Sequence, residues 1–245
     1  MKKILAVVLL LVCSGAFAQT GAVMTRKTMT GAEYAEFMKR VPKITDTKIY
    51  DREGNIVDSA KARELVKTFD YQINQTIPSG QTEYKHVLMK VDHAMEARMD
   101  ASSRLMFRPS SPKLWDGVIL DLTPLAKHTD ISKLDGKAVV LLFRNRNYGY
   151  MYKGINDAIA NFIDGNKFEV FAITNLDYAS AKAAQKAAPI LNARYVVDAQ
   201  DLIDFYETGG DALIVVTNAK HEITYAAKGG PAMVPRTLNK LLKEL

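Results

Sequence analysis

The sequence predicts an α/β fold: a three-layer α/β/α domain with a closing antiparallel hairpin, preceded by a small mixed α/β region. Two features of the second half of the chain support this fold class. Val139–Phe143 is a continuous apolar run, typical of a strand covered on both faces, and a helical pattern separates it from a second predicted buried strand at Phe168–Ile173. Closer to the C-terminus, two apolar segments flank Thr217–His221, a spacing that favours a β-hairpin. We therefore expect one mixed sheet between layers of helices.

The elements of this half follow one another with short connections. Pro189 ends an alanine-rich helix, because proline cannot donate the backbone hydrogen bond that would continue it. In chain order, hydrophobic periodicity predicts a strand at 139–143, a helix through 155–162, a strand at 168–173, a helix at 179–188, a short strand at 195–197, a short helix at 202–206, strands at 213–216 and 223–225, and a helix at 234–245.

The first half predicts smaller elements. A capping-box pattern at Thr30–Glu33 precedes a helix that Pro42 ends. We further expect short strands at 48–50 and 56–57 around a turn, a helix capped by Asp58 or Ser59, and a strand within 84–91. Two prolines and two serines in Arg108–Pro112 form the clearest break in the chain. The sequence thus predicts a small α/β region at 19–110 and the larger domain at 111–245.

Residues 1–18 have the pattern of a secretory signal peptide. Two lysines precede nine consecutive apolar residues, and Ala16–Ala18 supplies small residues at the cleavage positions. The alternative is a lipoprotein signal acylated at Cys13, which is disfavoured because Val12 stands where such signals have a small residue. No later run is long enough to span a membrane. We expect an exported protein, periplasmic or extracellular, with no transmembrane segment.

Composition excludes several classes of function. Cys13 is the one cysteine of the 245 residues, so cleavage after Ala18 leaves no thiol for catalysis, metal ligation or disulfides. Lys and Arg total 33 against 27 Asp and Glu, and this mild excess shows no cluster that indicates nucleic acid. The four histidines lack metal-ligand spacing, and no phosphate-binding glycine motif occurs. We expect no metal and no cofactor.

Leu134–Phe143 carries a resemblance to a known family. A Leu-x-Gly-Lys lead followed by an apolar strand that ends in phenylalanine resembles periplasmic thioredoxin-like proteins of the thiol-disulfide reductase or redoxin type. The resemblance covers about residues 115–245 and implies a thioredoxin-like fold. Such proteins place a Cys-x-x-Cys motif at the start of the next helix and a cis-proline before the hairpin. Here Tyr148–Met151 stands at the first place, and Asp211 or Ala212 at the second.

The loop that replaces the cysteine motif carries the candidate binding residues. Tyrosine and arginine are enriched at interface hot spots, because they offer large amphipathic surfaces at modest entropic cost. The alternative is a structural loop whose tyrosines cover the start of the helix. The candidates are Arg144, Arg146, Tyr148, Tyr150 and Met151, with Asp211 facing them across a groove.

These observations predict an exported, redox-inactive thioredoxin-like protein that acts as a binding module in the cell envelope, with a protein, a peptide or a small ligand as its partner. No residue is predicted to be catalytic. The resemblance also implies an alternative, an enzyme of the thioredoxin superfamily such as a thiol-disulfide oxidoreductase or a peroxiredoxin-like protein. That alternative is disfavoured because no cysteine follows Cys13. The sequence does not predict the oligomeric state.

Overall fold

A computed structural model describes residues 44, 46–144, 149–229 and 233–245 of the chain. These residues form two compact units, which divide between Arg98 and Met99. The predicted signal peptide at 1–18 and the predicted helix at 30–41 lie outside the described residues. Within the described ranges, no helix is long and apolar enough to cross a bilayer.

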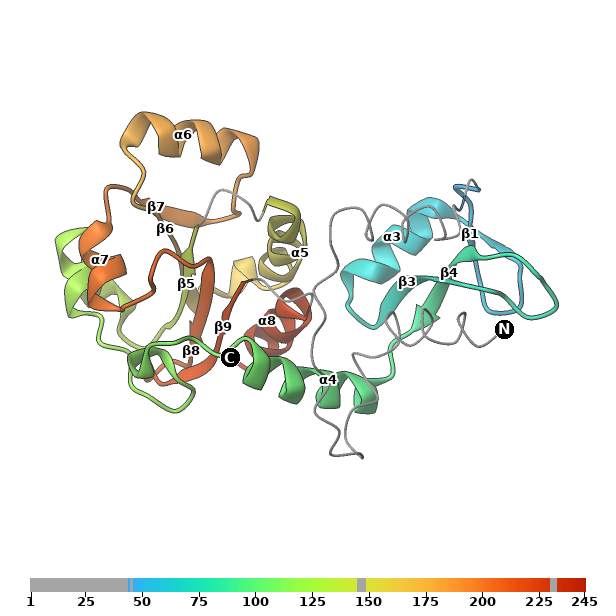
Figure 1. Cartoon of the computed structure of the whole chain (residues 1–245), viewed down its shortest axis with the longest axis horizontal. Helices are drawn as coiled ribbons and strands as arrows, with labels where there is room; N and C mark the ends of the chain where they lie inside the picture. Colours follow the sequence, from blue (N-terminus) through green and yellow to red (C-terminus); the bar gives the residue numbers. More distant parts are fainter. Residues whose placement is uncertain (1–43, 45, 145–148, 230–232) are drawn as a thin grey trace, which may run out of the picture. The chain divides into compact units, whose positions relative to one another are not determined.

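The N-terminal unit contains a four-stranded sheet in the order β2-β1-β4-β3 (Figure 1). Gly54, with a φ of +89°, lies in the predicted turn between β1 and β2, and the Asp58 carboxylate caps α3 by accepting a 2.8 Å hydrogen bond from the Lys61 amide. The structure confirms the predicted hairpin at 48–57, the helix that follows it and the strand within 84–91. The elements are β1 (Ile49–Tyr50), β2 (Ile56–Val57), α3 (Ser59–Lys67), β3 (Tyr71–Thr76) and β4 (Lys85–Lys90).

The C-terminal unit is built on a five-stranded mixed sheet in the order β7-β6-β5-β8-β9. The strands β5, β6 and β7 run parallel, β8 runs antiparallel to β5, and β9 closes the hairpin. All six residues of β5 are buried, as its continuous apolar sequence predicts. The strands are β5 (Ala138–Phe143), β6 (Phe168–Ile173), β7 (Ala193–Val196), β8 (Leu213–Thr217) and β9 (Ile223–Lys228).

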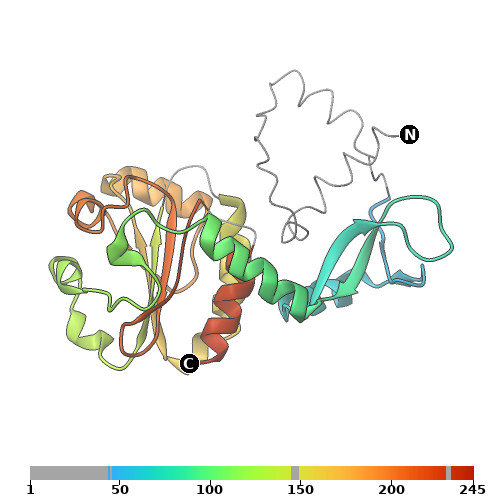
Figure 2. The ribbon, with the colours of Figure 1, turned by 60° about the horizontal axis from the view of Figure 1, so that its bottom comes forward.

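Helical segments cover both faces of this sheet (Figures 1 and 2). On one face α5 and α8 lie side by side; on the other, α7 packs with short 3-10 segments. The element order and the three layers are those predicted. The helices are α4 (His93–Met106), α5 (Gly149–Ala160), α6 (Tyr178–Ala187), α7 (Gln200–Phe205) and α8 (Val234–Lys243), and the 3-10 segments are Pro112–Leu114, Thr123–Lys127, Ile131–Leu134 and Ile163–Gly165.

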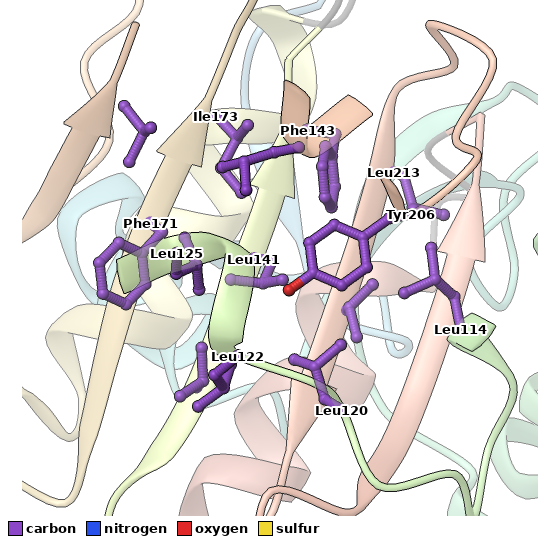
Figure 3. Packing of buried hydrophobic residues seen from close by; sticks show 14 of the residues in the cluster. Leu114, Leu120, Leu122, Leu125, Leu141, Phe143, Phe171, Ile173, Tyr206 and Leu213 are labelled. Atoms are coloured by element: carbon purple, nitrogen blue, oxygen red, sulfur yellow. The ribbon is translucent and has the colours of Figure 1, made fainter. Parts of the chain in front are cut away.

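The main core lies between the sheet and the α7 layer. Leu141 and Phe143 of β5 point into it, while the alternate residues of the strand point towards α5 and α8. The Tyr206 ring meets Phe143 edge to face, and its hydroxyl donates a 2.6 Å hydrogen bond to the Asp121 carbonyl (Figure 3). Burial raises the pKa of the Tyr206 phenol well above its ordinary value, so this hydroxyl stays a donor.

The proline- and serine-rich segment, which the sequence predicts as the domain boundary, packs along the C-terminal unit. The Arg108 guanidinium stacks 3.4 Å from the centre of the Trp115 ring, whose indole nitrogen donates to the Pro109 carbonyl. The Phe107 carbonyl accepts from the Lys228 amide of β9, and Leu114 is fully buried. These contacts attach the segment to the C-terminal unit. The two compact units therefore divide before this segment, between Arg98 and Met99 of α4.

Candidate functional site

The sheet edge where β5 and β6 end and β8 begins holds the described candidate residues. Phe143 at the end of β5 pairs with Leu213 at the start of β8, because these two strands run antiparallel. Arg144, directly after β5, and Asp211, shortly before β8, therefore lie at the same edge of the sheet. Loops at the carboxyl ends of parallel strands are the usual place for ligand sites in α/β sheets.

Arg144 is engaged by the surrounding structure. Its guanidinium lies 4.8 Å from the centre of the Tyr152 ring and 5.7 Å from that of Tyr195, and it donates a 3.0 Å hydrogen bond to the Ala188 carbonyl. Tyr152 is buried. The arginine thus connects the start of α5, the end of α6 and β7. These contacts give Arg144 a supporting role at the edge, which the sequence pattern alone did not indicate.

The structure describes the other predicted site residues to different extents. Arg146 and Tyr148 lie outside the described residues, while Tyr150 and Met151 lie in the first turn of α5, before the described side chains resume at Tyr152. Asp211 is exposed, and its amide donates a 3.1 Å hydrogen bond to the Thr208 carbonyl. The shared binding face therefore stays a prediction.

A cavity at this edge was missed by the sequence analysis. It has a volume of about 500 Å³, within the usual range of ligand pockets, and Asn175 lies on it just after β6. The 202–206 segment was predicted only as a short helix, yet carboxylates recur every third residue at Asp198, Asp201, Asp204 and Glu207. This spacing was the available signal. The cavity is lined by Asn175, Gln200, Ile203, Asp204, Glu207, Gly209 and Gly210.

Comparisons with known proteins give matches at the level of structure, over just under half of the chain. No family model and no curated protein matches the sequence. Solved structures similar to this chain include the thioredoxin domain of a thiol-disulfide oxidoreductase from Bacteroides vulgatus, at 17% identity over 46% of this chain and 85% of that chain with a TM-score of 0.38. A secreted disulfide oxidoreductase of Mycobacterium tuberculosis matches at 18% identity over 48% and 88%, with a TM-score of 0.40.

The strand order and directions decide the fold. Two parallel strands joined through a helix, a third parallel strand at the edge, and an antiparallel hairpin followed by a final helix make up this unit. The C-terminal unit has a thioredoxin-like fold. At these identities and TM-scores, the matched structures carry no argument about what this chain does. The predicted fold class is confirmed.

The thioredoxin-like unit carries no thiol where such proteins have their cysteine motif. No cysteine occurs in residues 14–245, and Tyr148–Met151 is the stretch that the sequence resemblance aligns with that motif. Thiol-disulfide exchange proceeds by attack of a thiolate on a disulfide sulfur, so the residues at this position cannot perform it.

The histidines of the described residues take part in local contacts. The Nε2 atom of His128 lies 3.1 Å from an Asp201 carboxylate oxygen, and that of His221 lies 3.1 Å from the Leu134 carbonyl. His86 lies on β4, and His93 begins α4. Among the side chains that the structure describes, no group of three or more His, Cys, Asp or Glu residues is arranged to hold a metal ion.

Proposed function

We propose that this protein is an exported, redox-inactive thioredoxin-like module that binds a protein or peptide partner in the cell envelope. The binding face is the sheet edge after β5 and before β8, with Arg146, Tyr148, Tyr150, Met151 and Asp211 as its residues. Arg144 belongs to the same edge, where its contacts with Tyr152 and Ala188 hold its side chain. Export follows from the signal pattern at residues 1–18.

One observation carries the proposal: a thioredoxin-like unit occurs in a chain without any cysteine after Cys13. The fold brings loops together at one sheet edge whatever their sequence, so the edge is retained when the thiols are lost. Tyrosines and an arginine in place of the cysteine motif supply the residue types that anchor protein interfaces. The alternative, a thiol-disulfide oxidoreductase or a peroxiredoxin-like enzyme, needs a thiolate that residues 14–245 do not contain.

The experiment is cross-linking of the full, tagged chain in intact envelopes, followed by quantification of the captured partner. Tyr148 and Tyr150 are changed together to alanine. We expect capture to fall tenfold or more, since a pair of anchor residues contributes about 2 kcal/mol or more to binding. Tyr84→Ala, at an exposed tyrosine of the N-terminal unit, is the matched control and leaves capture unchanged.

Thermal unfolding of the same variants separates binding from folding. If the tyrosines form a binding face, the double variant keeps the melting temperature of the wild type, because exposed substitutions usually change stability by less than about 0.5 kcal/mol. A large fall in melting temperature, or equal capture by the double variant and the wild type, contradicts the proposed face.

A further inference from the structure

The cavity beside Asp211 is built by three segments of the thioredoxin-like unit. Asn175 comes from the loop after β6, and Gln200, Ile203 and Asp204 come from α7. Gly209 and Gly210 form its rim, at φ values of +63° and +78° that glycine adopts without strain. No atom outside their chain neighbours lies within 4 Å of the place where a side chain would begin at either glycine. The rim towards Asp211 is thus open.

Asn175, Gln200 and Asp204 form a chain of hydrogen bonds along the cavity, and the last carboxylate keeps one oxygen available as an acceptor. The Asn175 amide donates a 3.1 Å hydrogen bond to the Gln200 side-chain oxygen, and the Gln200 amide donates a 2.8 Å hydrogen bond to Oδ1 of Asp204. Within the described part of the chain, Oδ2 of Asp204 has no partner. A carboxylate accepts up to about four hydrogen bonds, so Asp204 at the end of this chain can accept further hydrogen bonds from a ligand.

The cavity also has an apolar wall, which can contact the aliphatic part of a ligand. Ile203 lines the cavity and also packs against the main core, which fixes its position. Glu207 on the rim is held by a 2.8 Å ion pair with Lys113, and this hydrogen-bonded pair lowers the pKa of the Glu207 carboxyl. An apolar wall next to a fixed carboxylate matches a side chain with an aliphatic stem and a cationic end.

The local charge points to the same class of ligand. Residues 195–219 contain five acidic residues and no lysine or arginine, although the whole chain carries a net charge of +6. A potential of one sign around a concave site attracts groups of the opposite sign. Lys127 pairs with Asp201, and Lys113 pairs with Glu207. Among the carboxylates that line the cavity, Asp204 is therefore the one that has no ion pair within the described part of the chain.

We propose that this cavity binds the cationic side chain of an arginine or lysine from a peptide partner, with the aliphatic stem on Ile203 and the charged end on Asp204. The inference rests on the proposed function, because it names the partner chemistry recognised beside the same sheet edge. Arginine's five donors suit the acceptor-rich lining best.

The test is a titration of the full chain with Nα-acetyl-arginine amide, followed by NMR at the amides of Gly209 and Gly210. The neutral isostere Nα-acetyl-citrulline amide is the matched ligand. We expect saturable shifts at both glycines, binding of citrulline at least fivefold weaker, and weaker arginine binding at higher salt. Nα-acetyl-lysine amide is expected to bind as well, and more weakly than arginine.

The matched pair of variants is Asp204→Asn and Asp164→Asn. Asp204→Asn keeps an oxygen for the Gln200 amide and removes the charge, so arginine binding should fall at least fivefold. Asp164 is an exposed aspartate in the 3-10 segment before β6, at the other end of that strand, and its change should leave binding unaltered. Equal affinity for arginine and citrulline in the wild type overturns the inference, and this comparison does not depend on how any variant folds.

The outcomes separate this inference from the proposed function. Arginine binding that depends on Asp204, without capture of any partner in envelopes, supports the cavity and contradicts the proposed function. Capture that depends on Tyr148 and Tyr150 but not on Asp204, with no saturable arginine binding, supports the proposed function and overturns the cavity.

Discussion

Gly154 of the thioredoxin-like unit is a position where close packing excludes a larger side chain. Gly154 on α5 lies against Pro235 of α8, where a Cβ added to the glycine would lie 2.7 Å from the proline Cγ. The proline ring is rigid and cannot rotate away. A glycine inside a helix normally costs stability, so its presence here is explained by the close approach of the two helices.

The change Gly154→Ala is therefore expected to destabilise the protein by about 1–3 kcal/mol, because overpacking outweighs the gain in helix propensity. Urea denaturation followed by circular dichroism measures the effect. Gly165→Ala is the control, since the new Cβ would meet only the flexible Lys167 side chain at 3.6 Å. If Gly154→Ala proves more stable than the wild type, the close contact between α5 and α8 is wrong.

Asp177 gives a second prediction at this scale. Its carboxylate caps α6 by accepting a 2.9 Å hydrogen bond from the Ser180 amide, and this bond lowers the pKa of the Asp177 carboxyl. Because the pKa is lower in the folded state, the stabilisation is present above the unfolded pKa and is lost as the pH falls through the folded value. Asp177→Ala should lower the melting temperature at pH 7.

The pH dependence of that difference is the check. Melting temperatures of the wild type and Asp177→Ala, measured from pH 7 downward, should converge below about pH 4, while Asp177→Asn retains most of the cap at every pH. A difference that stays constant to pH 3 contradicts the assigned role of the carboxylate.

The elements differ in how far the sequence could predict them. β5 is a continuous apolar run and β6 is apolar apart from Glu169, so the burial of both strands was predictable from the sequence. β3 was not predicted, because Ile73 is its one aliphatic residue and its six residues are held by pairing with β4. The helix α4 was also missed. Arg104 near its end pairs with Asp100 on the same helix and with Asp116 farther along the chain, and a sequence pattern does not show such a distant partner.

Arg108–Pro112 was predicted as the domain boundary from its prolines and serines, whereas the packing of residues 107–115 predicts that this segment resists proteolysis. Limited proteolysis with an unspecific protease should leave it uncut under native conditions, because backbone must leave its hydrogen bonds and burial before a protease can bind it. Mass spectrometry of the fragments locates the cuts. Trp115→Ala, which removes the stacking partner of Arg108, should make the segment cleavable. Early cleavage of the wild type between 107 and 113 would instead support the predicted boundary.

At the scale of the whole molecule, the order of strands and helices in the second half was predictable, and the site was predictable only in part. The loop after β5 and Asp211 were assigned to one sheet edge through the resemblance, and the register of Phe143 with Leu213 brings Arg144 and Asp211 to that edge. The cavity was not predicted, because Asn175 and Gly209 come together only in the folded unit. Arg144 was predicted as a site residue, but its contacts with Tyr152, Ala188 and Tyr195 were not, because these residues meet only in the folded unit.

We propose that the thioredoxin-like unit of this protein works without thiol chemistry, and an insulin-reduction assay tests this most directly. The full chain and its Cys13→Ser variant are assayed for dithiothreitol-dependent reduction of insulin disulfides, with an active thioredoxin as the positive control. We predict that both proteins give the background rate of dithiothreitol without added protein, because no thiolate is available in residues 14–245. Catalysed reduction that persists in Cys13→Ser would contradict this proposal.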